Sequence, residues 1–111
     1  MPKSDSAYLE HMLDRASKII LFTEGMTEVQ FLNDQKPQSA VIRELEVIGE
    51  ASKRISEDFK NSNDSVPWRL MSGMRDVLIH DYEGVDALII WDTIQNDIPN
   101  LILNLKNAFR K

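Results

Sequence analysis

The sequence of 111 residues contains no cysteine. Disulfide bonds and thiolate metal sites are therefore excluded, and nothing indicates an oxidising compartment. Long hydrophobic runs are also missing: the longest, Ala87–Trp91, has five residues, whereas a membrane-spanning helix needs about 18. The N-terminal residues Met1–Asp5 are polar and lead directly into an amphipathic pattern, so we expect no signal peptide. These features predict a soluble cytoplasmic protein without a membrane partner.

Positive charge is scarce, since 13 Lys and Arg stand against 18 Asp and Glu, for a net charge of −5. Broad electrostatic binding to nucleic acid needs many basic contacts, so any RNA site has to be local. Such a site could draw on Lys53, Arg54, Arg69 and Arg75. The first three are more simply explained as parts of solvated helix faces.

No segment of any length alternates apolar and polar residues as a strand does, whereas apolar residues recur at steps of three and four. The chain is long enough for one domain, residues 1–111. The pattern predicts an all-α fold, an up-and-down bundle of four to five antiparallel helices. Pro99 should bend or divide the last of them near Asp97. The expected helices span about residues 6–23, 27–33, 36–61, 66–80 and 87–109.

Capping residues support most of these boundaries. Gly25 can end the first helix with a positive φ, and Thr27 and Gln30 have the spacing of a capping box. Ser65 is the expected N-cap of the fourth helix, with Pro67 in its first turn. Asp86 is the expected N-cap of the last helix.

Large apolar residues are in surplus on the last two predicted helices, which favours a homodimer. Trp68 and Trp91 are expected to anchor the core or that interface. His11 is expected on the surface of the first helix, without a function. The stripe of the long third helix should be buried; it comprises Val41, Leu45, Ile48, Ser52, Ile55 and Phe59.

The residues best suited to chemistry lie between Gly73 and Tyr82. Arg75 carries a permanent planar charge that matches phosphate oxygens in pairs, and His80 can exchange a proton near neutral pH. Tyr82 adds a hydroxyl, and Asp76, four residues before His80, could orient the imidazole. The sequence shows no zinc-type cluster, no phosphate-binding glycine loop and no Ser-His-Asp arrangement. We therefore expect no metal and no cofactor.

Helix geometry limits how these side chains can meet. Arg75 and Tyr82 are seven residues apart and nearly aligned, whereas His80 lies about 140° from Arg75 around an ideal helix. The three converge if the helix ends near His80, which Gly84 permits, or if a second copy of the chain supplies half of the site.

The spacing Arg75-x4-His80-x-Tyr82 resembles the motif of the HepT-like toxins of the HEPN superfamily. The resemblance covers nearly the whole chain, because further blocks follow the family's order and distances. These blocks are Tyr8–Leu13, Ala40–Ala51, Val66–Arg69, Gly84–Asp86 and Trp91. Asp76 departs from the pattern, since an asparagine often stands there, and an acid at this position would repel phosphate somewhat.

The resemblance implies a HEPN-like bundle and a homodimer whose two motifs face each other. It also implies metal-independent RNA cleavage by Arg75 and His80, with a minimal nucleotidyltransferase antitoxin as partner. In such a pair, the partner silences the toxin by transferring AMP to the tyrosine of the motif, which here is Tyr82.

A different class of function uses the same residues. A non-catalytic helical dimer could bind a nucleotide, or the partner nucleotidyltransferase, through the same cleft. In that case His80 would cap or pack against a helix, Arg75 would pair with Asp76 or Glu83, and Tyr82 would lie at the core edge.

Overall fold

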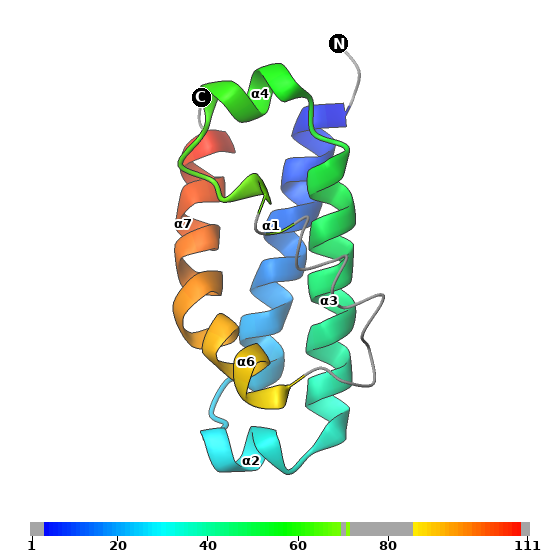
Figure 1. The fold of residues 1–111 in the computed structure, drawn as a ribbon, viewed down its shortest axis with the longest axis vertical. Coiled ribbons are helices and arrows are strands. Elements are labelled where there is room, and N and C mark those ends of the chain that lie inside the picture. The colour runs from blue at the N-terminus through cyan, green and yellow to red at the C-terminus, as the bar shows by residue number, and fades with distance from the viewer. Residues whose placement is uncertain (1–3, 70, 72–85, 110–111) are drawn as a thin grey trace.

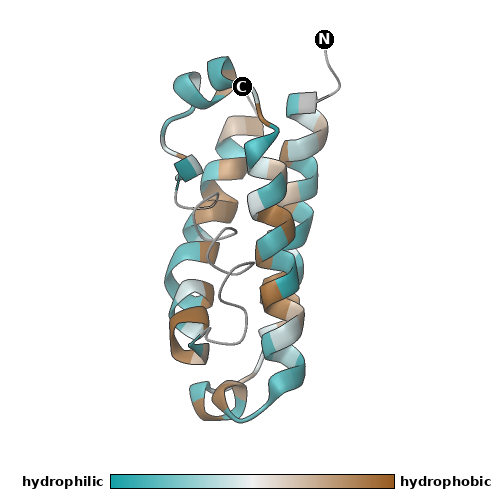
Figure 2. Ribbon diagram, turned by 45° about the vertical axis from the view of Figure 1, so that its right-hand side comes forward, coloured by the Kyte–Doolittle hydropathy of each residue, from teal (hydrophilic) through white to brown (hydrophobic). Residues whose placement is uncertain are grey.

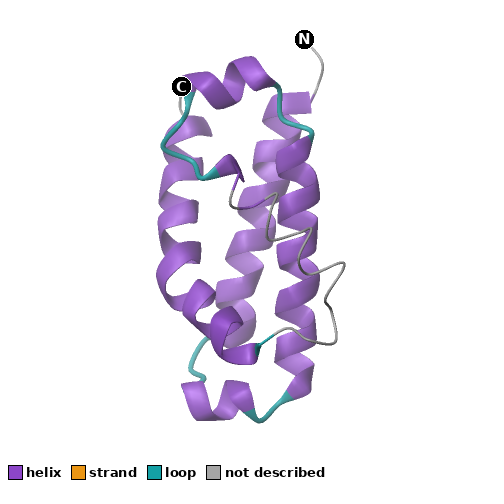
Figure 3. Cartoon of the chain, viewed as in Figure 1, coloured by secondary structure: helices purple, strands orange, loops and turns teal. Residues whose placement is uncertain are grey.

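The computed structural model describes residues 4–69, 71 and 86–109. Within them all regular secondary structure is helical (Figure 3), as predicted. The first helix, α1 (Ser4–Thr23), spans the long axis of the bundle and packs against α3 (Gln35–Lys53) and α7 (Ile98–Phe109) (Figure 1). Its buried stripe consists of Leu9, Met12, Ala16 and Ile19. These side chains recur at three- and four-residue steps, which explains why one face of α1 enters the core.

The turn after α1 has the predicted chemistry. Gly25 has φ 79°, a conformation that costs glycine little because it has no Cβ. Thr27 then caps α2 (Glu28–Leu32) with a capping box: the Thr27 amide donates to Gln30 Oε1 at 2.9 Å and the Gln30 amide donates to Thr27 Oγ1 at 3.2 Å. The box directs Phe31 into the core, where its ring centroid lies 5.3 Å from that of Trp91.

The prediction of one long helix over residues 36–61 is wrong. The chain forms α3, breaks at residues 54–56 and starts again as α4 (Glu57–Ser62). Ser56 is the N-cap, and its Oγ accepts a hydrogen bond from the Phe59 amide at 3.2 Å. Asp5 of α1 stabilises the break, because its carboxylate accepts hydrogen bonds from the Ser56 amide at 2.9 Å and from Ser56 Oγ at 2.6 Å. The helical spacing of apolar residues continues across the break, so the pattern alone could not show it.

Replacing Asp5 by Ala should lower the free energy of unfolding by about 1 kcal/mol, the usual value of an N-cap interaction. The reason is that the Ser56 amide and hydroxyl both lose their acceptor. Urea denaturation followed by circular dichroism measures the change. Glu10→Ala, an exposed acid on the same helix, is the control and should change stability much less.

The fourth predicted helix starts later than expected. A turn closed by the Val66 amide donating to Asn63 O at 3.2 Å precedes it, and helical residues begin at Trp68. The prediction that Ser65 is the N-cap, with Pro67 in the first turn, is therefore wrong. Trp68 is buried, as expected of a core anchor, and its Nε1 donates to Asn63 O at 3.0 Å. The remainder of this predicted helix lies outside the described residues.

The C-terminal part confirms both the predicted cap and the predicted division. Asp86 caps α6 (Ala87–Asp92), accepting from the Leu88 amide at 2.8 Å. A π-helical segment, η2 (Thr93–Asp97), then separates α6 from α7. Pro99 lacks the amide hydrogen that a regular α-helical hydrogen bond would use. This accounts for the i→i+5 hydrogen bonding of the π-helical segment just before it. The result is the predicted helical bundle, closed at one end by α2 and α6 (Figure 1).

Candidate functional site

The four residues that the sequence singled out, Arg75, Asp76, His80 and Tyr82, lie outside the described residues. The structure describes the chain on either side of them. Before the segment, Met71 is helical and buried. After it, Asp86 caps α6. The assignment of these four residues therefore rests on their sequence pattern.

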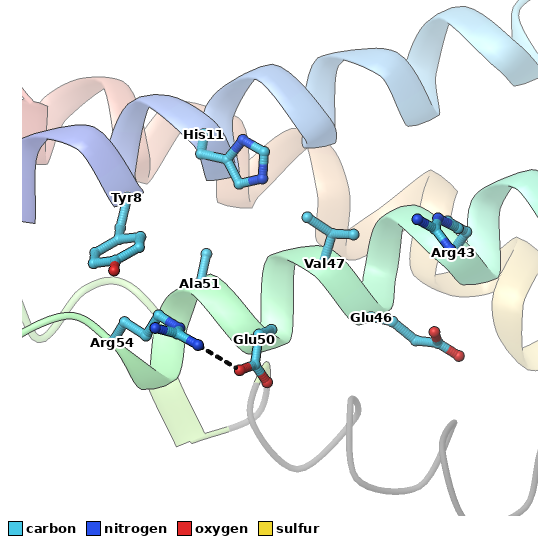
Figure 4. A pocket seen from close by; sticks show the side chains of 8 residues that line it. All are labelled: Tyr8, His11, Arg43, Glu46, Val47, Glu50, Ala51 and Arg54. Carbon is cyan, nitrogen blue, oxygen red and sulfur yellow. Dashed lines mark hydrogen bonds and ion pairs between the residues drawn. The ribbon is translucent and has the colours of Figure 1, made fainter. Parts of the chain in front are cut away.

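Among the described residues, ionisable side chains gather in a groove between α1 and α3. We call it the α1–α3 groove; it has a volume of about 380 Å³. Figure 4 shows Tyr8 and His11 of α1 on one wall and residues of α3 on the other. The lining residues are Tyr8, His11, Arg43, Glu46, Val47, Glu50, Ala51 and Arg54.

The charges of the α1–α3 groove balance one another. Arg54 Nη2 lies 3.4 Å from Glu50 Oε1, and this pair is drawn in Figure 4. Interactions with the Tyr8 hydroxyl, followed by the charge and hydrogen bond of Glu50, raise the pKa of Arg54 above its ordinary value. Arg43 and Glu46 add one charge of each sign. A groove with two guanidinium groups and two carboxylates has no net charge, so it does not attract phosphate as a basic cleft would.

Another ion pair joins α1 to α3 and has a structural role. Arg15 Nη1 lies 3.3 Å from Glu44 Oε1, and Arg15 Nη2 lies 2.9 Å from Asp14 Oδ2. Desolvation lowers the pKa of Arg15, but the hydrogen bonds and charges of Asp14 and Glu44 outweigh it, so that this pKa lies above its ordinary value. Glu44 is buried, and Arg15 supplies the opposite charge that a buried carboxylate needs. Sequence reasoning missed this pair because 29 residues separate its partners.

Three of the four basic residues considered for an RNA site lie within the described residues, on two separate segments of the chain. Lys53 and Arg54 end α3, whereas Arg69 lies in the short helical segment after Pro67. All three are exposed, as expected of solvated faces. His11 is also exposed, which confirms its predicted place on the surface of α1.

Within residues 4–69, 71 and 86–109, no group of three His, Cys, Asp or Glu side chains could hold a metal ion. In the same part of the chain, no helix combines the length and the apolar character needed to cross a bilayer.

Comparison with known proteins identifies the family. The family described as "Ribonuclease HepT-like" matches residues 12–108. A protein of Methanocaldococcus jannaschii named "Putative RNase MJ0127" is 48% identical over 111 residues, covering 99% of this chain and 92% of that protein. "Probable ribonuclease HepT" of Thermococcus cleftensis is 48% identical over 111 residues, covering 100% of this chain and 97% of that protein. No solved structure matches the chain. Together with the helical bundle and the motif at residues 75–82, these similarities show that the chain belongs to the HepT-like ribonuclease family.

Proposed function

We propose that the chain is a metal-independent endoribonuclease that acts as the toxin of a toxin–antitoxin pair. The observation that carries this proposal is the spacing Arg75-x4-His80-x-Tyr82 in a chain of the HepT-like ribonuclease family. The motif supplies a proton-transfer group and a permanent cation, which are the two things that transesterification of RNA requires. The substrate is RNA, and the test is cleavage of an RNA pool in the presence of EDTA.

The reaction divides between two side chains. His80 of one protomer, as general base, removes the proton from a ribose 2′-hydroxyl, and the 2′-oxygen attacks the adjacent phosphorus. The bond from phosphorus to the 5′-oxygen breaks, and His80 of the second protomer, as general acid, protonates that leaving oxygen. Arg75 stabilises the negative charge that grows on the phosphoryl oxygens in the transition state. The products are a 2′,3′-cyclic phosphate and a free 5′-hydroxyl.

Asp76 supports this chemistry. A carboxylate four residues before His80 favours the imidazolium form and can orient the ring. The same charge opposes the approach of phosphate. We therefore expect Asp76→Asn to weaken orientation of His80 while easing RNA binding.

The mechanism needs a homodimer, because one imidazole cannot be acid and base in the same cleavage step. Leu103, an exposed apolar side chain in the middle of α7, is consistent with an interface on that helix. Light scattering at micromolar concentration should give a mass twice the 12.8 kDa of the chain. A monomer at that concentration, or a dimer whose motifs face away from each other, would refute the shared site.

Control of the toxin is the second part of the proposal. The partner is a minimal nucleotidyltransferase antitoxin that transfers AMP from ATP to the Tyr82 hydroxyl. The phenolic oxygen attacks the α-phosphorus of ATP, a phosphodiester forms, and pyrophosphate leaves. The modified Tyr82 then carries a negative charge seven residues from Arg75.

A non-catalytic helical dimer is the alternative. It would bind a nucleotide or the partner nucleotidyltransferase through the same cleft, with Arg75, His80 and Tyr82 as binding residues. Cleavage of the RNA pool by the wild type and by His80→Ala separates the two functions. A binding protein would show no cleavage in either case.

A further inference from the structure

One end of the bundle exposes large apolar side chains from α2 and α6. The exposed fractions are 67% for Val29, 37% for Leu32, 42% for Leu88 and 62% for Ile89. The two helices pack against each other, and Figure 2 shows hydrophobic residues on both at this end. We call these four residues the α2–α6 patch. Exposed apolar side chains that cluster on the surface of a small soluble domain commonly mark an interaction surface.

The two stretches of chain that carry the α2–α6 patch bear acidic side chains and no basic ones. Neither residues 19–35 nor residues 86–105 contain a lysine or arginine, and Lys36, on the first turn of α3, is the next base along the chain. The same two stretches carry six acids, all exposed. These are Glu24, Glu28, Asp34, Asp86, Asp92 and Asp97.

This distribution of charge decides between the candidate occupants. A second copy packed through the same patch in a two-fold interface would bring carboxylates against carboxylates, and like charges at an interface weaken it. RNA would be repelled for the same reason. A protein surface with an apolar centre and a rim of lysine and arginine is complementary in both respects.

The α2–α6 patch lies close along the chain to Tyr82, the residue that the proposed partner would modify. Tyr82 precedes Leu88 by six residues, and six extended residues reach at most about 20 Å. An enzyme that modifies Tyr82 must therefore work within that distance of the patch. Building on the proposed function, we infer that the α2–α6 patch is the docking surface for the nucleotidyltransferase, which binds it through a basic-rimmed apolar surface.

The dissociation constant between this chain and the proposed minimal nucleotidyltransferase, expressed from the same source, tests the inference. Ile89→Ser and Val29→Ser should each weaken binding about tenfold or more, because each removes an apolar contact from the centre of the interface. Both residues are exposed, so the bundle should keep its thermal stability. Asp92→Lys should weaken binding about threefold or more at low salt and much less at about 0.5 M NaCl, where rim charges are screened.

Two controls are matched to these variants. Phe109→Ser removes an exposed apolar side chain from the end of α7, at the opposite end of the bundle (Figure 1). Asp64→Lys reverses an exposed acid in the loop after α4. Neither should change the affinity for the nucleotidyltransferase.

The possible results test the docking surface and the identity of the partner separately. If the wild type binds and both serine variants bind equally well, the inference is overturned while the proposed partner stands. If Ile89→Ser dissociates the homodimer, the patch is a self-interface and the inference also fails. If the wild type does not bind the nucleotidyltransferase, the proposed partner is wrong and the docking surface falls with it, whereas RNA cleavage still tests the nuclease.

Discussion

Replacing His80 by Ala should reduce the rate of RNA cleavage about 10²-fold or more, the usual contribution of a general acid or base. In a homodimer the substitution removes both imidazoles, so it abolishes proton removal from the 2′-hydroxyl and proton donation to the leaving oxygen together. Cleavage by the wild type should persist in excess EDTA and leave a 2′,3′-cyclic phosphate, because the attacking group belongs to the RNA. Gel analysis of labelled RNA, with enzymatic treatment of the 3′ ends, measures both properties.

Arg75→Ala should cause a loss of similar size, because the transition-state charge would then lack its cation. Arg75→Lys should restore only part of the activity, since an ammonium group is not a planar fork. Substrate affinity and turnover should respond differently: a purely binding role for Arg75 would raise KM with kcat unchanged, whereas a transition-state role lowers kcat.

The chain provides its own control for the His80 experiment. It contains two histidines, and His11 is exposed on α1. His11→Ala should therefore cleave RNA like the wild type. Strict dependence on magnesium would refute the mechanism, and unchanged cleavage by His80→Ala would show that the nuclease activity belongs to a contaminant.

Some helix boundaries could be predicted from the sequence and others could not. Local capping chemistry predicted the boundaries at Gly25, Thr27 and Asp86, because each depends on hydrogen bonds or φ values within a few residues. The break at Ser56 depends on Asp5, 51 residues away. A contact of that kind is a property of the packed bundle, so the sequence predicted one continuous helix where the chain forms α3 and α4.

The same distinction applies to the candidate site. The motif from Arg75 to Tyr82 is a short pattern, and it pointed to the family that the comparisons confirm. The α1–α3 groove joins Tyr8 and His11 to α3 residues more than 30 positions later. No local spacing signals such a groove, and residues such as Arg43 and Glu46 read only as a polar helix face. The α2–α6 patch was hidden for a related reason, because Leu88 and Ile89 look like core residues until their exposure is measured.

Modification of Tyr82 should abolish RNA cleavage without unfolding the bundle. The AMP group adds bulk and a phosphodiester charge to the motif, and that charge would pair with Arg75 in place of the RNA phosphate. We expect the chain co-expressed with the nucleotidyltransferase to gain the mass of one AMP for each modified tyrosine. Its circular dichroism spectrum should remain helical while its nuclease activity is lost.

The chain contains two tyrosines, so substituting each in turn identifies the site of modification. Tyr82→Phe should gain no AMP and should escape silencing by transfer, whereas Tyr8→Phe should be modified and silenced like the wild type. Tyr8 is half-buried in the α1–α3 groove beside Arg54, which makes its hydroxyl a poorer acceptor. Peptide mass spectrometry locates the adduct directly. Complete neutralisation of a chain whose Tyr82 stays unmodified would mean that the partner inhibits by binding alone, and the AMP-transfer part of the proposal would then be abandoned.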